Sequence, residues 1–133
     1  MKLSTAKVIG DILLAIKINR IADKGAKAAL TKDFLAIRKA VKEVDDDREA
    51  LASKFREDWA DEFGKAEKSD EYKKAEAEAN ATLFELYDKE ADVELQPIPG
   101  ELLYDPEVWG ENDTLGQIAN SVELLVKNGI AAE

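Results

Sequence analysis

Hydrophobic positions between Thr31 and Asp92 repeat with helical spacing over two stretches, separated by a polar break at residues 64–69. Steps of three, four and seven residues are typical of one helix packed along another. The first stretch places its apolar side chains at Phe34, Ile37, Val41, Val44, Leu51 and Phe55, and then drifts to Trp59 and Phe63. The second is rich in alanine and has Tyr72, Ala75, Ala79, Leu83 and Leu86 on one face. The pattern predicts a long antiparallel helical hairpin over residues 31–91.

Local signals suggest where the first helix of this hairpin begins and where its apolar face is interrupted. Thr31 can cap the free amides of a helix start, and Asp33 would then lie in the first turn, where a negative charge suits the helix dipole. Arg48 occupies a position that the spacing would make apolar. Its guanidinium is expected to reach solvent or pair with a carboxylate, with an anion-binding role as the alternative.

The residues before the hairpin predict a short N-terminal helix over residues 1–24, capped by Ser4 or Thr5. On a helical wheel one broad apolar face belongs to Val8, Ile9, Ile12, Leu13 and Ile16, and a second one to Leu14, Ile18 and Ile21. Because a large exposed apolar patch is unusual on a monomer, the second face predicts an interaction surface. It would be covered either by the C-terminal helix of the same chain or by a second copy in a homodimer.

Beyond the hairpin, residues 92–112 are expected to form an extended segment and a loop. The alternation from Val93 to Ile98 is typical of a short strand. Residues 102–104 are the only other strand candidate, so the pairing could be local, with another chain, or absent. Trp109 is the one apolar anchor of the loop, either packed onto the helices or available to a partner.

A C-terminal helix follows over residues 113–129. Thr114 and Gln117 fit a reciprocal capping pattern, and Asn128-Gly129 supplies a left-handed stop with Ile130 folding back. The fold class is therefore mainly α: one domain over residues 1–133, with a long antiparallel helical hairpin, two flanking helices and at most one short β segment.

Composition restricts the chemistry of the chain. It has no cysteine and no histidine, which removes thiolate nucleophiles, disulfides, imidazole bases and nearly all zinc sites. Its seven glycines are scattered, so no phosphate-binding loop is present. One acidic group could attract a hard cation, although acids on an exposed helix face are usually solvated: Glu57, Asp58, Asp61 and Glu62. We predict a protein that is not an enzyme, with no catalytic residue, metal or cofactor.

Charge is distributed unevenly along the chain, whose net charge is −10. Residues 1–44 hold ten Lys/Arg against four Asp/Glu, and residues 45–133 hold nine against twenty-five. The acidic remainder would repel a phosphate backbone, so nucleic acid is an unfavoured partner except at a local basic patch. Within the hairpin, basic side chains are expected near acidic ones of the returning helix: Lys32, Arg38, Lys39 and Lys42 near Glu85, Asp88 and Glu90. The apolar run near the N-terminus is too short and too charged to span a bilayer, which predicts a cytoplasmic location.

Four segments carry a resemblance to a known group of proteins: residues 1–3, residues 36–39, Glu85-Leu86 and residues 93–98. In their order and spacing, the chain resembles short uncharacterised proteins encoded in tailed-phage and prophage genomes, over about residues 1–103. The resemblance implies a phage or prophage setting, in the cytoplasm of the host cell, and supplies no catalytic residues.

Two functions remain open. The first is a non-enzymatic protein–protein interaction or assembly protein, such as a phage accessory protein. The second is a regulator that binds nucleic acid, or a nucleic-acid enzyme, through the basic N-terminal third. The residues proposed to take part in interactions are Leu14, Ile18, Ile21, Arg48 and Trp109.

Overall fold

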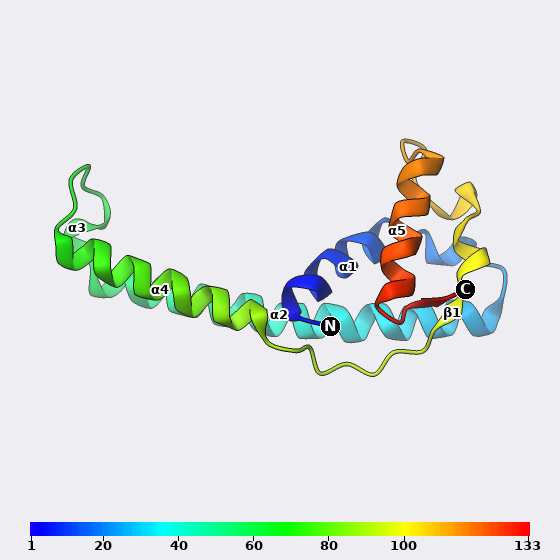
Figure 1. Cartoon of the computed structure of the whole chain (residues 1–133), viewed down its shortest axis with the longest axis horizontal. Helices are drawn as coiled ribbons and strands as arrows, with labels where there is room; N and C mark the ends of the chain where they lie inside the picture. The colour runs from blue at the N-terminus through cyan, green and yellow to red at the C-terminus, as the bar shows by residue number, and fades with distance from the viewer.

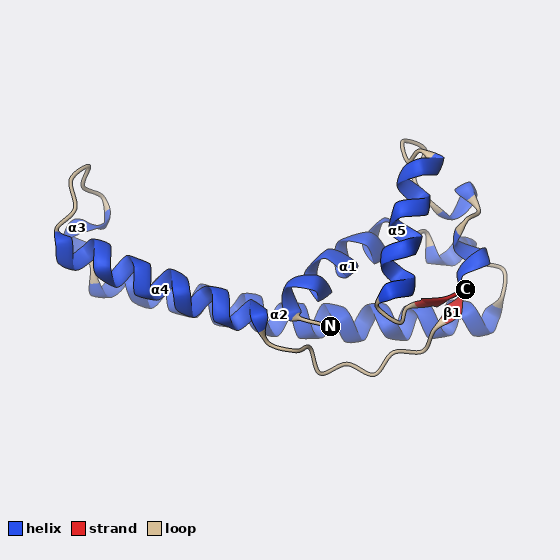
Figure 2. Ribbon diagram, in the orientation of Figure 1, coloured by secondary structure: helices blue, strands red, loops and turns tan.

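One helix, α2 (Lys24–Asp58), runs along most of the molecule and belongs to both of its parts (Figure 1). The computed structural model describes all residues, 1–133. We call residues 1–44 and 98–133 the body, which contains the hydrophobic core, and residues 45–88 the arm, which projects from it. The structure is 71% helical and has only a two-stranded sheet of two residues per strand, which confirms the mainly α fold (Figure 2).

The start of α2 lies seven residues before the predicted cap at Thr31. The Asp23 side chain caps the helix by accepting a hydrogen bond from the Ala26 amide at 2.9 Å. Thr31 lies inside the helix, where its hydroxyl donates to the Lys27 carbonyl at 2.8 Å, so the prediction of a cap at Thr31 was wrong. Asp23 is an equally good capping residue. The helix can begin this early because the alanines that follow favour helix, and their effect outweighs that of the single glycine, Gly25, in the first turn.

The N-terminal helix is shorter than predicted: α1 (Leu3–Ala15) ends before a 3-10 turn, η1 (Ile18–Arg20). At Ile16 the backbone becomes extended, with ψ 129°, and the Lys17 amide donates to the Val108 carbonyl at 2.7 Å. Since Ile18 and Ile21 are not part of α1, the second apolar face expected there with Leu14 does not exist. Ile16 and Ile21 both turn into the core, which explains why the chain leaves the helix at this point.

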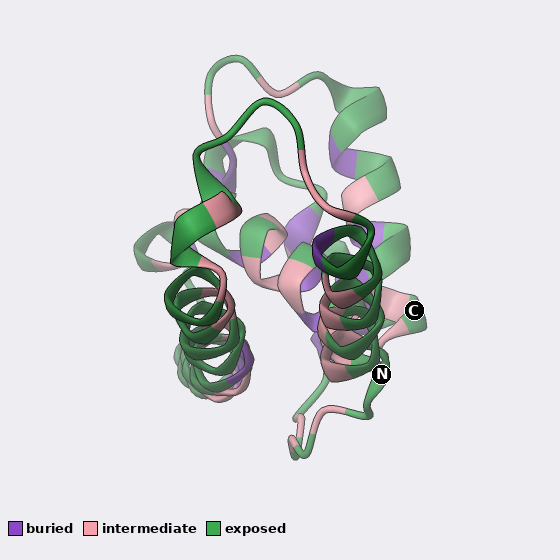
Figure 3. Ribbon diagram, turned by 90° about the vertical axis from the view of Figure 1, so that its left-hand side faces the viewer, coloured by how far each residue is buried: buried purple, intermediate pink, exposed green.

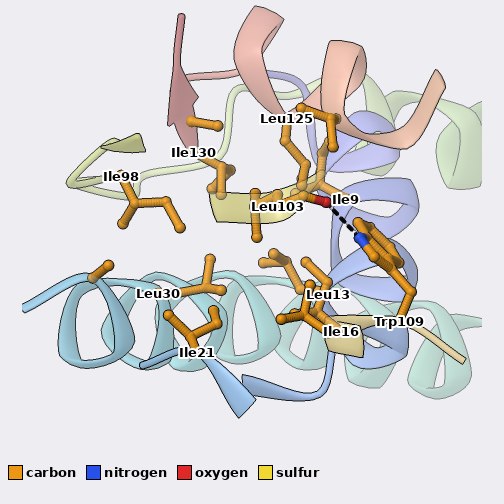
Figure 4. Packing of buried hydrophobic residues seen from close by; sticks show 14 of the residues in the cluster. Ile9, Leu13, Ile16, Ile21, Leu30, Ile98, Leu103, Trp109, Leu125 and Ile130 are labelled. Carbon is orange, nitrogen blue, oxygen red and sulfur yellow. Dashed lines mark hydrogen bonds between the residues drawn. The ribbon is translucent and has the colours of Figure 1, made fainter. Parts of the chain in front are cut away.

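The core of the body lies between α1, the first half of α2 and α5 (Leu115–Lys127) (Figure 4). Two 3-10 turns, η2 (Gly100–Leu103) and η3 (Pro106–Val108), close it from the side. Trp109 is 3% exposed, and its indole N–H donates to the Leu103 carbonyl at 2.6 Å. It therefore anchors the loop to the core. The largest fully buried side chains of the core include Ile9, Leu13, Leu30, Leu103, Leu125 and Ile130.

The C-terminal helix α5 has the predicted cap and stop, and its helical residues, Leu115–Lys127, lie within the predicted segment 113–129. Thr114 and Gln117 form the reciprocal capping box. At the other end Gly129 has φ 79°, the left-handed conformation that glycine adopts without strain. The Ile130 amide donates to the Leu125 carbonyl at 2.9 Å, and Ile130 is completely buried. The chain thus turns back under the helix by the expected hydrogen-bond pattern.

The extended segment pairs with the C-terminus. Strand β1 (Ile98–Pro99) is parallel to β2 (Ala131–Ala132), with Ile98 opposite Ala131. The local candidate, residues 102–104, belongs to the η2 turn and its end, so the segment does not pair locally. Gly100 lies close to the last residues, since a Cβ there would stand 2.9 Å from the Ala132 carbonyl oxygen.

The arm confirms the predicted antiparallel hairpin. The second half of α2 continues through α3 (Ala60–Phe63), and α4 (Asp70–Asp88) returns beside it (Figure 3). Ser69 caps α4 by accepting from the Tyr72 amide at 3.1 Å. The Glu62 carboxylate in turn accepts the Ser69 amide at 2.8 Å and the Ser69 hydroxyl at 2.9 Å, and these bonds lower the pKa of Glu62.

A strap from residue 89 to residue 97 returns the chain from the arm to the body (Figure 1). The Leu3 amide donates to the Lys89 carbonyl and the Ala91 amide to the Met1 carbonyl, both at 2.8 Å. Near its other end the Gln96 amide donates to Asp33 Oδ1 at 2.9 Å. Asp33 is completely buried, and its Oδ2 has no partner. This carboxylate faces the strap and not a helix end, so its predicted place in a first helical turn was wrong.

Asp33 should make the free energy of unfolding depend on pH, and a comparison of D33N with the wild type measures this dependence. Burial raises the pKa of Asp33 above 3.8, and the Gln96 amide and Lys32 oppose it only in part. The native state therefore keeps this proton to a higher pH than the unfolded state does, and its contribution to stability falls as pH rises through that window. The stability of D33N relative to the wild type should therefore increase as pH rises above about 3.9, the ordinary pKa of an aspartate. Urea midpoints at several pH values measure it, and a difference that stays constant with pH would contradict the prediction.

Candidate interaction surfaces

The first candidate surface is an apolar groove between α2 and α4 in the arm, with a cavity of about 260 Å³. We call it the arm groove and define it by six apolar side chains. Leu51 is 40% and Phe63 is 48% exposed, so both remain open to solvent. The six are Leu51, Phe55, Phe63, Tyr72, Ala79 and Leu83.

Contacts at the tip of the arm hold one end of this groove. The rings of Phe55 and Tyr72 lie 5.3 Å apart and those of Trp59 and Tyr72 5.6 Å apart, both edge to face. Tyr72 is 3% exposed and is the one buried residue of α4. Aromatic pairs of this geometry attract beyond the effect of burial alone. Tyr72 is therefore the most buried side chain of the arm.

A polar junction holds the other end, where the arm leaves the body. Asp45 on α2 accepts the Tyr87 hydroxyl of α4 at 2.5 Å and the Lys7 ammonium of α1 at 3.1 Å. Burial raises the pKa of Asp45, but these two bonds and the charges of Lys7 and Arg48 outweigh it, so the pKa lies below 3.8. Between this junction and the tip, the facing side chains Ala52 and Ala79 are too small to fill the space between the helices. The groove is thus fixed at both ends and open between them.

The acidic group that could attract a cation has other roles. Asp58 pairs with Lys54 at 2.6 Å, and Glu62 holds Ser69 at the start of α4. Glu57 and Asp61 are exposed. Nowhere in the chain are three or more acidic side chains placed so that they could hold a metal ion.

A second candidate surface lies on the body, where α1, η1 and α2 border two cavities of about 240 Å³ and 460 Å³. Leu14 and Phe34 line both. The Arg38 guanidinium lies 5.9 Å from the Phe34 ring centre and lines the smaller cavity together with Asp11, whereas Lys17 lines the larger one. We call this surface the basic groove and define it by Leu14, Lys17, Ile18, Phe34, Arg38 and Val41.

The five residues predicted from the sequence do not form one site. Leu14 is 68% exposed and borders the basic groove, and Ile18 is half-buried beside it. Ile21 and Trp109 lie in the core, so burial within the chain explains their apolar side chains and no partner protein is needed. Arg48 is exposed at the base of the arm, near Asp45.

Charge pairing across the hairpin differs from the expectation. The acidic end of α4 meets the N-terminus of the chain: the Met1 ammonium lies 3.0 Å from Glu90, and Lys2 lies 2.6 Å from Asp88. Lys39 lines a cavity with Glu90, near the acidic end of α4 as expected, but neither it nor Lys32 or Arg38 forms an ion pair. Lys42 pairs with Asp46 of its own helix.

Phe84 was missed by the sequence reasoning, although it is the most exposed large apolar side chain, at 73%. The sequence could have predicted an exposed phenylalanine here, because Phe84 lies outside the apolar face of α4 that begins at Tyr72.

Comparison with protein families, curated proteins and solved structures yields no match for this chain. None of its helices combines the length and the apolar character that crossing a membrane requires.

Proposed function

We propose that this chain is a non-enzymatic interaction or assembly protein whose arm groove receives the apolar face of a helix from another protein. The observation that carries the proposal is the position of the groove. It lies on a projecting arm outside the core, with Leu51 and Phe63 exposed and with contacts that fix it at both ends.

A helix is the best-fitting occupant because the groove runs between two antiparallel helices. A third helix laid along them would pack its apolar ridge between theirs, as amphipathic helices do in helix-binding grooves. Residues 45–88 hold fifteen Asp/Glu against seven Lys/Arg. The partner helix should therefore carry basic side chains beside its apolar face.

A phage or prophage accessory role in the host cytoplasm forms part of this proposal and rests on the sequence resemblance. The alternative, a regulator that uses the basic N-terminal third, has less support. Four of the ten basic side chains in residues 1–44 are held in ion pairs within the chain: Lys2, Lys7, Arg20 and Lys42.

Affinity capture from a lysate of the organism that encodes the chain tests the proposal. Wild-type protein should retain a partner that L51E loses, because a carboxylate in the arm groove opposes burial of an apolar helix face. L115E is the matched control, since Leu115 is 70% exposed on α5, far along the chain from the groove. Equal recovery of every retained protein by wild type and L51E would count against the arm groove.

A further inference from the structure

The strap is tied to the rest of the chain mainly at its two ends. At the arm end, the Lys89 carbonyl and the Ala91 amide are bonded to the N-terminal residues. Beyond them, the only hydrogen bond made by residues 92–97 is the one that the Gln96 amide donates to Asp33 Oδ1, at 2.9 Å. The attachment of the strap to the body therefore depends on a single polar contact, and the acceptor in that contact can be protonated.

Asp33 is the one charged side chain that the fold buries completely. Its Oδ1 accepts the Gln96 amide, and its Oδ2 has no partner. The one charge that favours its ionised form is that of Lys32, an exposed neighbour on the same helix. A buried carboxylate with one donor and no paired cation is costly to ionise.

The elements that pack against α2 in the body do not supply the missing counter-charge. Strand β1 has no titratable residue. The charged side chains of α1, of the η1 region and of the middle of the strap form neither a hydrogen bond nor an ion pair with Asp33. They are Lys7, Asp11, Lys17, Arg20, Asp92 and Glu94.

Ionisation of Asp33 should therefore favour a strap that has moved away from it. In the closed state burial raises the pKa of Asp33, and the Gln96 amide offsets this only in part. Once the strap lifts, water reaches both carboxylate oxygens and the pKa returns to about 3.9. Since the open state then holds its proton less tightly than the closed state, a rise in pH shifts the equilibrium toward the open state.

We infer that Asp33 is a proton-controlled latch, which holds the strap on α2 when neutral and releases residues 92–97 when ionised. The arm stays attached, because α2 continues from the body into the arm. The latch is independent of the arm groove. It also adds a step to the pH dependence of unfolding described above, since the strap opens while the rest of the chain stays folded.

Hydrogen exchange of the Gln96 amide, followed by NMR on the full chain between about pH 4 and about pH 7, tests the latch. The protection factor, which corrects for the intrinsic exchange rate, should fall by up to tenfold per pH unit in the wild type until pH passes the raised pKa of Asp33. D33N is the matched variant, because asparagine keeps the acceptor oxygen but does not ionise. Its protection factor at Gln96 should not change with pH.

Low concentrations of urea separate opening of the strap from unfolding of the whole chain. Exchange at Gln96 should be insensitive to urea, because a local opening exposes little surface. The Ile130 amide is the control, since it donates to the Leu125 carbonyl in the core. Its exchange should accelerate steeply with urea, because it requires global unfolding.

Wild-type exchange at Gln96 that accelerates with pH but not with urea, together with constant protection in D33N, supports the latch. Protection at Gln96 that does not change with pH in the wild type overturns it. The same urea dependence at Gln96 and Ile130 also overturns it, because the strap would then open only when the chain unfolds. These two criteria need the wild type alone, so they hold even if D33N fails to fold. A folded D33N that loses protection with pH as the wild type does would assign the effect to another group and overturn the latch as well.

Discussion

V44D should lower the free energy of unfolding by about 3 kcal/mol or more, whereas L51D should lower it by about 1 kcal/mol or less. Val44 is 4% exposed, at the point where α2 passes the end of α4. Leu51, which lies about two helical turns further along α2 toward the tip of the arm, is 40% exposed. A carboxylate at position 44 would be buried beside a cavity that already has four acidic side chains against two lysines. The acids are Glu43, Asp47, Glu90 and Asp92.

Urea unfolding followed by circular dichroism measures both changes. V44A is the control, since it removes the apolar contacts without adding a charge, and it should cost less than V44D. The sequence alone places Val44 and Leu51 on the same apolar face and treats them alike. Equal losses for V44D and L51D would therefore show that the arm is packed as tightly as its junction with the body, contrary to the structure.

W109A should destabilise the body by about 3 to 5 kcal/mol, the range for large core aromatics replaced by alanine. Trp109 fills the space beside η2 and η3 and ties the loop to the core through its hydrogen bond to the Leu103 carbonyl, at 2.6 Å. Its loss would leave a cavity and would also leave that carbonyl without its donor.

W109F separates the two contributions. Phenylalanine keeps much of the apolar packing but cannot donate, so its cost should be smaller than that of W109A and close to the penalty for one unpaired carbonyl, about 1 to 3 kcal/mol. Calorimetric melting of the three proteins provides the comparison. A W109F protein as stable as the wild type would mean that the indole hydrogen bond adds nothing, and a stable W109A would contradict the place of Trp109 in the core.

Elements defined by local signals could be predicted well from the sequence. The capping box at Thr114 and Gln117 and the left-handed Gly129 fixed both ends of α5, because each depends only on residues within one or two turns. The apolar face of α4 was also predicted correctly, since Leu83 and Leu86 are both half-buried against α2. The start of α2 was missed because two good capping residues compete there, and the helix begins at the earlier one.

Features that depend on distant residues could not be predicted. Ile16 ends α1 because Val108, far along the chain, accepts the Lys17 amide, and no local signal marks that position. The pairing of Ile98 with Ala131 could not be predicted, because Ala131 lies in a two-residue segment that is too short to show a strand pattern. The arm groove was missed for a similar reason: alanine spacing indicates close helices, but the space left between them depends on how the tip and the Asp45 junction hold the two ends.

The most direct measurement of the central claim, that the arm groove binds a partner helix, is the affinity of the captured partner for defined variants. Isothermal titration should show a dissociation constant at least tenfold weaker for L51E than for the wild type, or about 1.4 kcal/mol, with L115E unchanged. L51E must retain the wild-type melting temperature for the comparison to hold. A partner that binds L51E and the wild type with equal affinity would contradict the claim.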